Sequence, residues 1–274
     1  GDLSKWNIGS VITMYWMFGY SQFNNDSLTN WDVSNVVSLN SMFNNSQFNG
    51  DLSNWVLRSG VDIAKLFNAS QFNNDSLANW NVENVVNLTY MFADSPFKGD
   101  ISKWNVSNVT GMGNMFYNSQ FNGDISGWDV GNVTNMNHMF FNSPFNGDIS
   151  GWDVGNVNSS QGMFQSSQFN QDISKWDVSN ITNMRYMFSD NIFFNQDISG
   201  WNVSNVTDMY SMFRHSPFNQ DISGWDVSNV MEMTYMFDGS QFNKDISNWV
   251  INSSANIVDA FPDTMNDAFK PIQQ

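Results

Sequence analysis

The chain has 274 residues, a net charge of −16 at pH 7 and an aromatic content of 16%. So many aromatic residues can build a core, which argues against disorder, and the negative charge argues against nucleic acid as a partner. The lack of cysteine excludes disulfides and thiol-based sites. No apolar stretch approaches the roughly 20 residues of a membrane span, so we predict no direct membrane insertion.

A unit of 24–25 residues repeats through the chain, and each unit carries one tryptophan. These ladder tryptophans are Trp6, Trp31, Trp55, Trp80, Trp104, Trp128, Trp152, Trp176, Trp201, Trp225 and Trp249. A phenylalanine follows each of them by twelve residues. Such periodicity predicts a repeat solenoid of eleven units over residues 1–261, with residues 262–274 as a C-terminal cap or tail.

The unit over residues 121–140 shows the predicted elements in chain order. Trp128 and Val130 alternate with period two, which is typical of a short strand. Met136, Met139 and Phe140 follow at a spacing that favours one helical turn facing inward. We expect the strands of successive coils to pair in parallel about 4.8 Å apart.

Length differences between units mark the turns. Ser27 and Ser76 are inserted before a leucine, and residues 191–193 lengthen the loop before Phe194. A solenoid tolerates insertions at its turns. After the last unit, Met265 and Phe269 are predicted to fold over the final coil.

The unit reads Phe-Asn-(Gly/Gln)-Asp-Ile-Ser-x-Trp-Asp-Val-Ser-Asn-Val-Thr-x-Met-x-x-Met-Phe. It recurs with few changes at residues 97–116, 121–140, 169–188, 194–213 and 218–237. This motif resembles the BspA-like leucine-rich repeat of bacterial surface proteins and lipoproteins, over residues 1–261. The resemblance implies a leucine-rich-repeat-like right-handed coil, an extracellular or cell-surface location and a role in adhesion. Units three, seven and eleven depart from the motif, so a surface that needs an unbroken ladder would be interrupted there.

The tryptophan ladder has two interpretations. Exposed indoles would form a stacking platform for sugars, whereas inward indoles would form the core. Eleven exposed indoles would make a very large apolar patch, so we predict that the ladder is buried. Trp16 stands outside the ladder at a variable position, and we predict that it is exposed.

An aspartate stands four residues before most ladder tryptophans. Asp124, Asp148 and Asp172 are the calcium candidates, because Ca²⁺ is bound by about six to eight oxygens. The other interpretation is an Asx turn, in which each carboxylate accepts a backbone N–H bond. We favour the turn because spacing alone does not bring several oxygens together. The prediction is therefore no cofactor, with calcium as the alternative.

An asparagine stands four residues after most ladder tryptophans. These residues are Asn35, Asn84, Asn108, Asn132, Asn156, Asn180, Asn205 and Asn229. We predict a structural ladder whose side chains bond the backbone of neighbouring coils. Asn108 and Asn132 also lie in glycosylation sequons, but an asparagine buried in a ladder would carry no glycan.

The residues that flank each ladder tryptophan are predicted to face outward. They include Asp129, Asp153, Asp177 and Asp226, opposite glycines that let a partner approach closely. One interpretation is an acidic binding face. The alternative is a plain solvated face.

The positions around each Met-Phe pair vary freely between units, so the core does not dictate them. All seven tyrosines and both histidines fall at these positions. Tyr, Trp and Arg are the types that anchor interfaces. The residues predicted to contact a partner are Trp16, Tyr90, Tyr117, His138, Phe141, Tyr186, Tyr210 and Tyr235. The alternative is that they cover the side of the solenoid as packing.

The sequence carries no nucleophile elbow, phosphate-binding loop or dinucleotide fingerprint, and we predict no enzymatic activity. The leading hypothesis is an extracellular or surface-displayed adhesion module that contacts a protein or glycan through a repeat-spanning face. The alternative hypothesis is a structural spacer, sheath or filament subunit that self-associates edge to edge.

Overall fold

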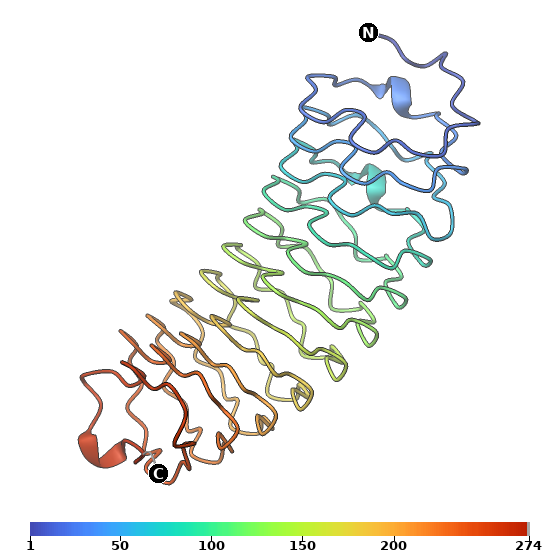
Figure 1. The fold of residues 1–274 in the computed structure, drawn as a ribbon. Helices are drawn as coiled ribbons and strands as arrows, with labels where there is room; N and C mark the ends of the chain where they lie inside the picture. The colour runs from blue at the N-terminus through green and yellow to red at the C-terminus, as the bar shows by residue number, and fades with distance from the viewer. Residues whose placement is uncertain (273–274) are drawn as a thin grey trace.

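Successive repeat units lie on top of one another as the coils of a solenoid in the computed structural model, which describes residues 1–272 (Figure 1). We number the coils 1–11 by their ladder tryptophans, from Trp6 to Trp249. The stack is elongated and gently curved, and the two termini lie at opposite ends. The predicted repeat solenoid is confirmed.

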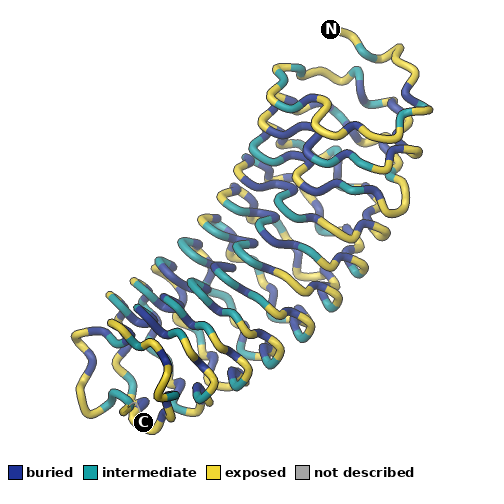
Figure 2. The backbone as a smooth tube through the Cα atoms, in the orientation of Figure 1, coloured by how far each residue is buried: buried dark blue, intermediate teal, exposed yellow. Residues whose placement is uncertain are grey.

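Each coil contributes side chains from equivalent positions to one continuous core. In coil 6 these include Trp128, Met136, Met139 and Phe140, all of them buried. Buried and exposed backbone therefore alternate at the same places in every coil (Figure 2). Phe140 stacks on Phe116 and Phe164 of the neighbouring coils with ring centroids 5.7 and 5.8 Å apart, and on Phe145 at 4.1 Å. Such rings repeat along the stack, so most of the hydrophobic stabilisation arises between neighbouring coils.

The ladder tryptophans of coils 2–11 are buried, as predicted, with 3–4% of their surface exposed. Each of these indoles donates its Nε1–H to a backbone carbonyl of the preceding coil at 2.9–3.2 Å. In coil 6, Trp128 donates to the carbonyl of Ile101. The indole thus fills the core and satisfies a polar group that burial would otherwise leave unpaired. Trp6 in the first coil is 53% exposed.

The predicted strand at Trp-x-Val does not form. Among residues 1–272, pairing between coils consists of isolated parallel bridges seven residues after the tryptophan, such as Asn135 with Ser159. The parallel direction is as predicted, but the location was wrong. Trp128 and Val130 are both inward, which the alternation indicated, yet Asp129 between them folds into a turn with the N–H of Gly131. Because the turn uses the N–H of Gly131, this group does not pair with a neighbouring coil, and no β-ladder extends along the segment.

The predicted helical turn at Met-x-x-Met-Phe is also wrong. The N–H of Met139 does bond the carbonyl of Met136, but the N–H of His138 bonds the next coil, at the carbonyl of Gln161. His138 has a φ of 52° and Asn142 a φ of 47°, so this segment is a series of turns through left-handed residues. Met136, Met139 and Phe140 are nevertheless buried, because two consecutive turns also bring these positions to the inner side of the coil.

Two left-handed residues recur in almost every coil. The first position holds Trp16, Ser41, Lys65, Tyr90, Asn114, His138, Gly162, Tyr186, Ser211, Tyr235 and Asp259. The second holds Tyr20, Asn45, Ala69, Asp94, Asn118, Asn142, Ser166, Asp190, His215 and Gly239. For a residue with a Cβ this conformation costs about 1–2 kcal/mol. The stacked core must therefore outweigh repeated local strain.

The inserted residues form turns, as predicted. Helix η1 (Asp26–Leu28) and helix η2 (Asp75–Leu77) are single 3₁₀ turns that contain Ser27 and Ser76. Asn191 in the third insertion is buried, and its side-chain amide donates to the carbonyl of Phe169 at 3.0 Å.

The C-terminal segment covers the last coil, as predicted, although residues 273–274 lie outside the described residues. Met265 is buried, and the carbonyl of Phe269 in helix η3 (Asp267–Phe269) accepts the N–H of Ile246. Among residues 1–272, no helix has the length and apolar character that crossing a membrane would require.

Candidate binding surface

Two asparagine ladders hold the coils in register. The predicted ladder is present except at Asn84: Asn132, for example, donates its Nδ2–H to the carbonyl of Ser107 in the preceding coil at 2.7 Å. Its members are exposed, however, and not buried as predicted. A second ladder was missed. Asn146 donates its backbone N–H to Oδ1 of Asn122, and the same contact recurs along the stack. The repeated Phe-Asn pair was the signal for it.

The aspartates before the tryptophans form Asx turns. Asp124 accepts the backbone N–H of Ser126 at 2.9 Å, and Asp148 and Asp172 make the same bond with their own serines. This bond, with a further one from the serine side chain, lowers the pKa of Asp124. Within residues 1–272, no three His, Cys, Asp or Glu side chains come together as metal ligands. The calcium candidates therefore line up along the stack without converging.

These turns predict a loss of stability in acid. The folded pKa of each carboxylate lies below its ordinary value of 3.8, so the unfolded chain binds more protons in that range. The stabilisation is complete well above pH 3.8 and is lost as pH falls through the lower folded pKa. We expect the thermal midpoint to drop in this window. Asparagine at Asp124, Asp148 and Asp172 keeps the acceptor but does not titrate, so this variant should show a flatter profile; an identical profile would contradict the assignment.

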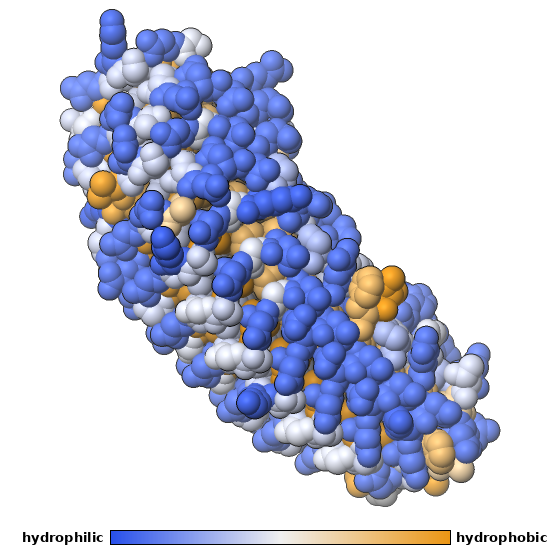
Figure 3. Space-filling view, turned by 180° about the vertical axis from the view of Figure 1, so that it is seen from behind, coloured by the Kyte–Doolittle hydropathy of each residue, from blue (hydrophilic) through white to orange (hydrophobic). Residues whose placement is uncertain are grey.

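The outward aspartates beside the tryptophans are exposed, as predicted. Asp129, Asp153, Asp177 and Asp226 each accept the backbone N–H two residues later, at 3.0–3.1 Å. They form a second series of Asx turns. Seen from behind, the molecule is mostly hydrophilic, and hydrophobic residues gather only in small separate spots (Figure 3).

The variable positions lie side by side along the stack and form a strip that we call the aromatic edge. In each coil it comprises the two residues between the first core methionine and the Met-Phe pair and the two residues after that pair; in coil 6 these are Asn137, His138, Phe141 and Asn142. Trp16 is exposed, as predicted. The other predicted contact residues are half-buried, because each packs against neighbouring coils. They are Tyr90, Tyr117, His138, Phe141, Tyr186, Tyr210 and Tyr235.

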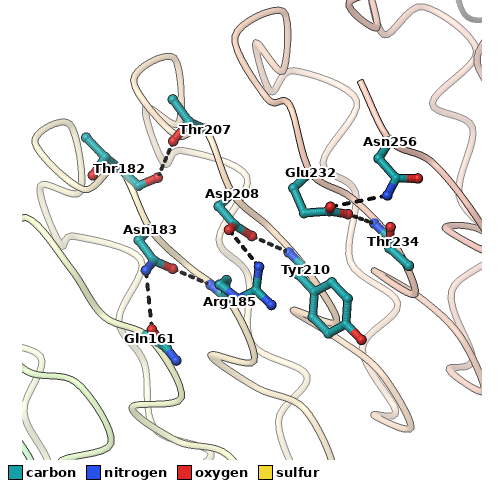
Figure 4. Close-up of polar contacts among 10 residues, drawn as sticks. All are labelled: Gln161, Thr182, Asn183, Arg185, Thr207, Asp208, Tyr210, Glu232, Thr234 and Asn256. Carbon is teal, nitrogen blue, oxygen red and sulfur yellow. Dashed lines mark hydrogen bonds and ion pairs between the residues drawn. The ribbon is translucent and has the colours of Figure 1, made fainter. Parts of the chain in front are cut away.

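The largest cluster on the aromatic edge spans coils 8–10. Tyr186 and Tyr210 meet edge to face with centroids 5.1 Å apart, and Tyr210 meets Tyr235 in the same way at 6.0 Å. The guanidinium of Arg185 lies 4.4 Å from the ring centroid of Tyr210 and 2.9 Å from Oδ2 of Asp208 (Figure 4). Cation–π and ionic contacts together fix these side chains in place.

A smaller cluster spans coils 5 and 6. Tyr117 and Phe141 stack with centroids 4.5 Å apart, and the ring of His138 stands edge-on to both. Burial lowers the pKa of His138, which favours the neutral imidazole over the charged form.

Both histidines of the edge stand over a glycine of the next coil. A Cβ on Gly162 would meet Nδ1 of His138 at 2.2 Å, and a Cβ on Gly239 would meet Cδ2 of His215 at 2.3 Å. His215 is also linked to Asp190 through Nδ1 at 2.8 Å. Each ring thus occupies the space that a side chain of the next coil would fill.

The residues that form the parallel bridges place polar side chains beside the aromatic edge. In coils 8–10 they are Asn183, Asp208 and Glu232, which accept the N–H two residues later (Figure 4). Burial acts to raise the pKa of Glu232, but hydrogen bonds from Thr234 and Asn256 outweigh it, and the pKa is lowered. Sequence reasoning missed these residues; their free variation between units was the available signal.

Of the three departing units, only the third interrupts this ladder. Within residues 1–272, Asp62 pairs with Ser38 but no bridge joins it to Asn87. Ser159 in unit seven bridges both neighbours, and Asn256 in unit eleven bridges Glu232. The surface of coils 4–11 is therefore continuous, and the predicted interruptions at units seven and eleven are wrong.

Comparison with known proteins yields one family. The model described as "Mycoplasma protein of unknown function, DUF285" matches residues 1–98, 62–174 and 165–271, which together span almost the whole chain. No curated protein and no solved structure matches.

Proposed function

The chain belongs to the DUF285 family of Mycoplasma repeat proteins, and from this premise we propose that it is a surface-displayed binding module. Its partner is a protein or glycan that contacts the aromatic edge across several coils. The repeat motif, which resembles BspA-like leucine-rich repeats of bacterial surface proteins, supports the extracellular location. The proposal includes no catalysis.

The cluster of Tyr186, Tyr210 and Tyr235 carries the proposal. The core positions beneath these tyrosines hold Met and Phe in most coils, whereas the residues at the edge differ from coil to coil. Three half-buried rings are held against each other and against Arg185, so a partner would find them already ordered. Preordered aromatic residues lose little entropy on binding and are typical interface anchors.

The test compares two triple variants at Tyr186, Tyr210 and Tyr235. Serine at all three positions removes the rings, and we expect it to abolish binding on protein and glycan arrays. Phenylalanine retains the rings, and we expect it to keep most binding and nearly all thermal stability. Binding that survives the serine variant, with its fold intact by circular dichroism, would contradict the proposal.

A structural spacer or filament subunit is the second candidate. Neighbouring coils pair through isolated parallel bridges along the stack, and the same contacts between copies would join them edge to edge. Light scattering and negative-stain imaging separate the two functions: filaments favour the spacer, and monodisperse particles favour the binding module.

A further inference from the structure

The protein contains its own example of how the aromatic edge holds a cation. Arg185 extends from coil 8 to Asp208 in coil 9, and its guanidinium lies over the rings of Tyr186 and Tyr210. Lys65 lies over Tyr90 in the same way, with Nζ 5.3 Å from the ring centroid. A carboxylate beside paired tyrosines is thus a cation site in this scaffold.

One coil further on, a related arrangement has no ion pair within the described chain, although its register differs, since Ser211 and Thr234 stand at the positions equivalent to Tyr186 and Tyr210. Glu232 replaces Asp208, and Tyr210 and Tyr235 form a second edge-to-face pair. Glu232 accepts the N–H of Thr234 and the side-chain amide of Asn256 (Figure 4). Within residues 1–272, no Lys, Arg or His lies within ion-pair distance of its carboxylate. Its carboxylate is half-buried and hydrogen-bonded, and the charge of Arg185 helps to lower its pKa from beyond ion-pair distance.

An acidic groove adjoins this pair. It has a volume of about 520 Å³ and lies where coils 10 and 11 meet the C-terminal cap, lined in part by Asp238, Asp259 and Asp263. Its wall is continuous with the tyrosines, since Tyr235 donates its N–H to the carbonyl of Val258, next to Asp259. Asp238 is paired with Arg214 at 3.0 Å. Asp259 and Asp263 have no ion-pair partner in the described part of the chain.

We propose that Glu232, Tyr210, Tyr235 and the groove beyond them bind a basic segment of a partner protein. One arginine or lysine of that segment would lie between Glu232 and the tyrosines, as Arg185 does beside Asp208. A second would enter the groove toward Asp259 and Asp263. The net charge of −16 would draw such a segment in, and three carboxylates without an ion-pair partner favour a cationic partner over a neutral glycan. The inference rests on the proposed function and names its partner class.

The experiment measures binding of a fluorescent, end-blocked hexa-arginine peptide by anisotropy, at low and at high salt. The site variant carries Glu232→Gln and Asp259→Asn. Glutamine keeps an acceptor for the N–H of Thr234, and asparagine tolerates the left-handed backbone of Asp259. We expect this variant to bind about tenfold more weakly than the wild type.

The matched control carries Asp148→Asn and Asp172→Asn, which remove the same charge from the Asx turns and keep their acceptors. We expect its affinity to stay close to that of the wild type. Equal weakening in both variants would show a diffuse electrostatic effect and overturn the inference, as would a wild type that does not bind the peptide. Either result leaves the proposed function standing if the serine variant of the three tyrosines still loses its partner on the arrays.

Discussion

Replacement of Trp128 with alanine should lower the free energy of unfolding by about 3–5 kcal/mol. The indole is 3% exposed, stacks parallel to Trp104 at a centroid distance of 6.5 Å and lies against Phe116. Alanine leaves a cavity in the middle of the stack and removes the donor from the carbonyl of Ile101. Denaturant unfolding followed by circular dichroism measures the loss. Because the cavity weakens the coupling between neighbouring coils, we also expect the two halves of the stack to unfold in separate transitions.

Trp6 supplies the matched control. It occupies the same repeat position but is 53% exposed, and its main ring contact is with Trp31 at 6.2 Å. Its replacement with alanine should cost clearly less than that of Trp128, because about half of the indole is already in contact with water. Similar losses for both variants would mean that inward stacking of the indoles is not what stabilises the solenoid.

Alanine at Gly162 should destabilise the protein by about 2–3 kcal/mol. The residue has a φ of +58°, which costs a residue with a Cβ about 1–2 kcal/mol. The added methyl group also meets the ring of His138, and the ring must move out of its packed position.

A double-mutant cycle separates the two contributions. In a His138→Ala background, Gly162→Ala should keep the backbone cost but lose the collision, so the two changes should couple by about 1 kcal/mol in free energy of unfolding. The pair His215 and Gly239 has the same arrangement and should behave alike. Strict additivity in both pairs would show that the rings are free to rotate away.

The sequence predicted the stack and its core because both follow from period and burial alone. Trp128, Met136 and Phe140 are inward in any backbone that repeats every 24 residues with a closed coil. The direction of pairing follows as well, since identical units stacked by translation pair in parallel. The Asx turn at Asp124 was predictable because its geometry is local to three residues.

The backbone of the Met-Phe segment was not predictable from its spacing. An i, i+3, i+4 pattern is shared by a helical turn and by consecutive turns with a left-handed residue between the core positions. Tyr186 and Tyr235 make the turns still harder to predict, because a bulky aromatic residue rarely adopts the positive φ that both have here. Only contacts with neighbouring coils, such as the N–H of Tyr186 on the carbonyl of Tyr210, select the turns.

The sequence predicted the aromatic residues of the candidate binding surface but not its charged residues. Free variation between units identified the tyrosines. It did not identify Asp208 as the ionic partner of Arg185, because Asp208 lies in the next coil. Asp208 is 23 residues away in sequence and 2.9 Å away in space. The pairing requires the register between coils, which the three-dimensional structure supplies.

The ladders have a consequence for how the protein can change over generations. The indole, asparagine and backbone bonds that join coils link each coil to its immediate neighbours, at sequence separations near one repeat. Loss or duplication of one unit that follows the motif would leave the same indole and asparagine bonds at the new junction. The solenoid can therefore lengthen or shorten by one coil at a time, and edge residues can be substituted while the core residues stay unchanged.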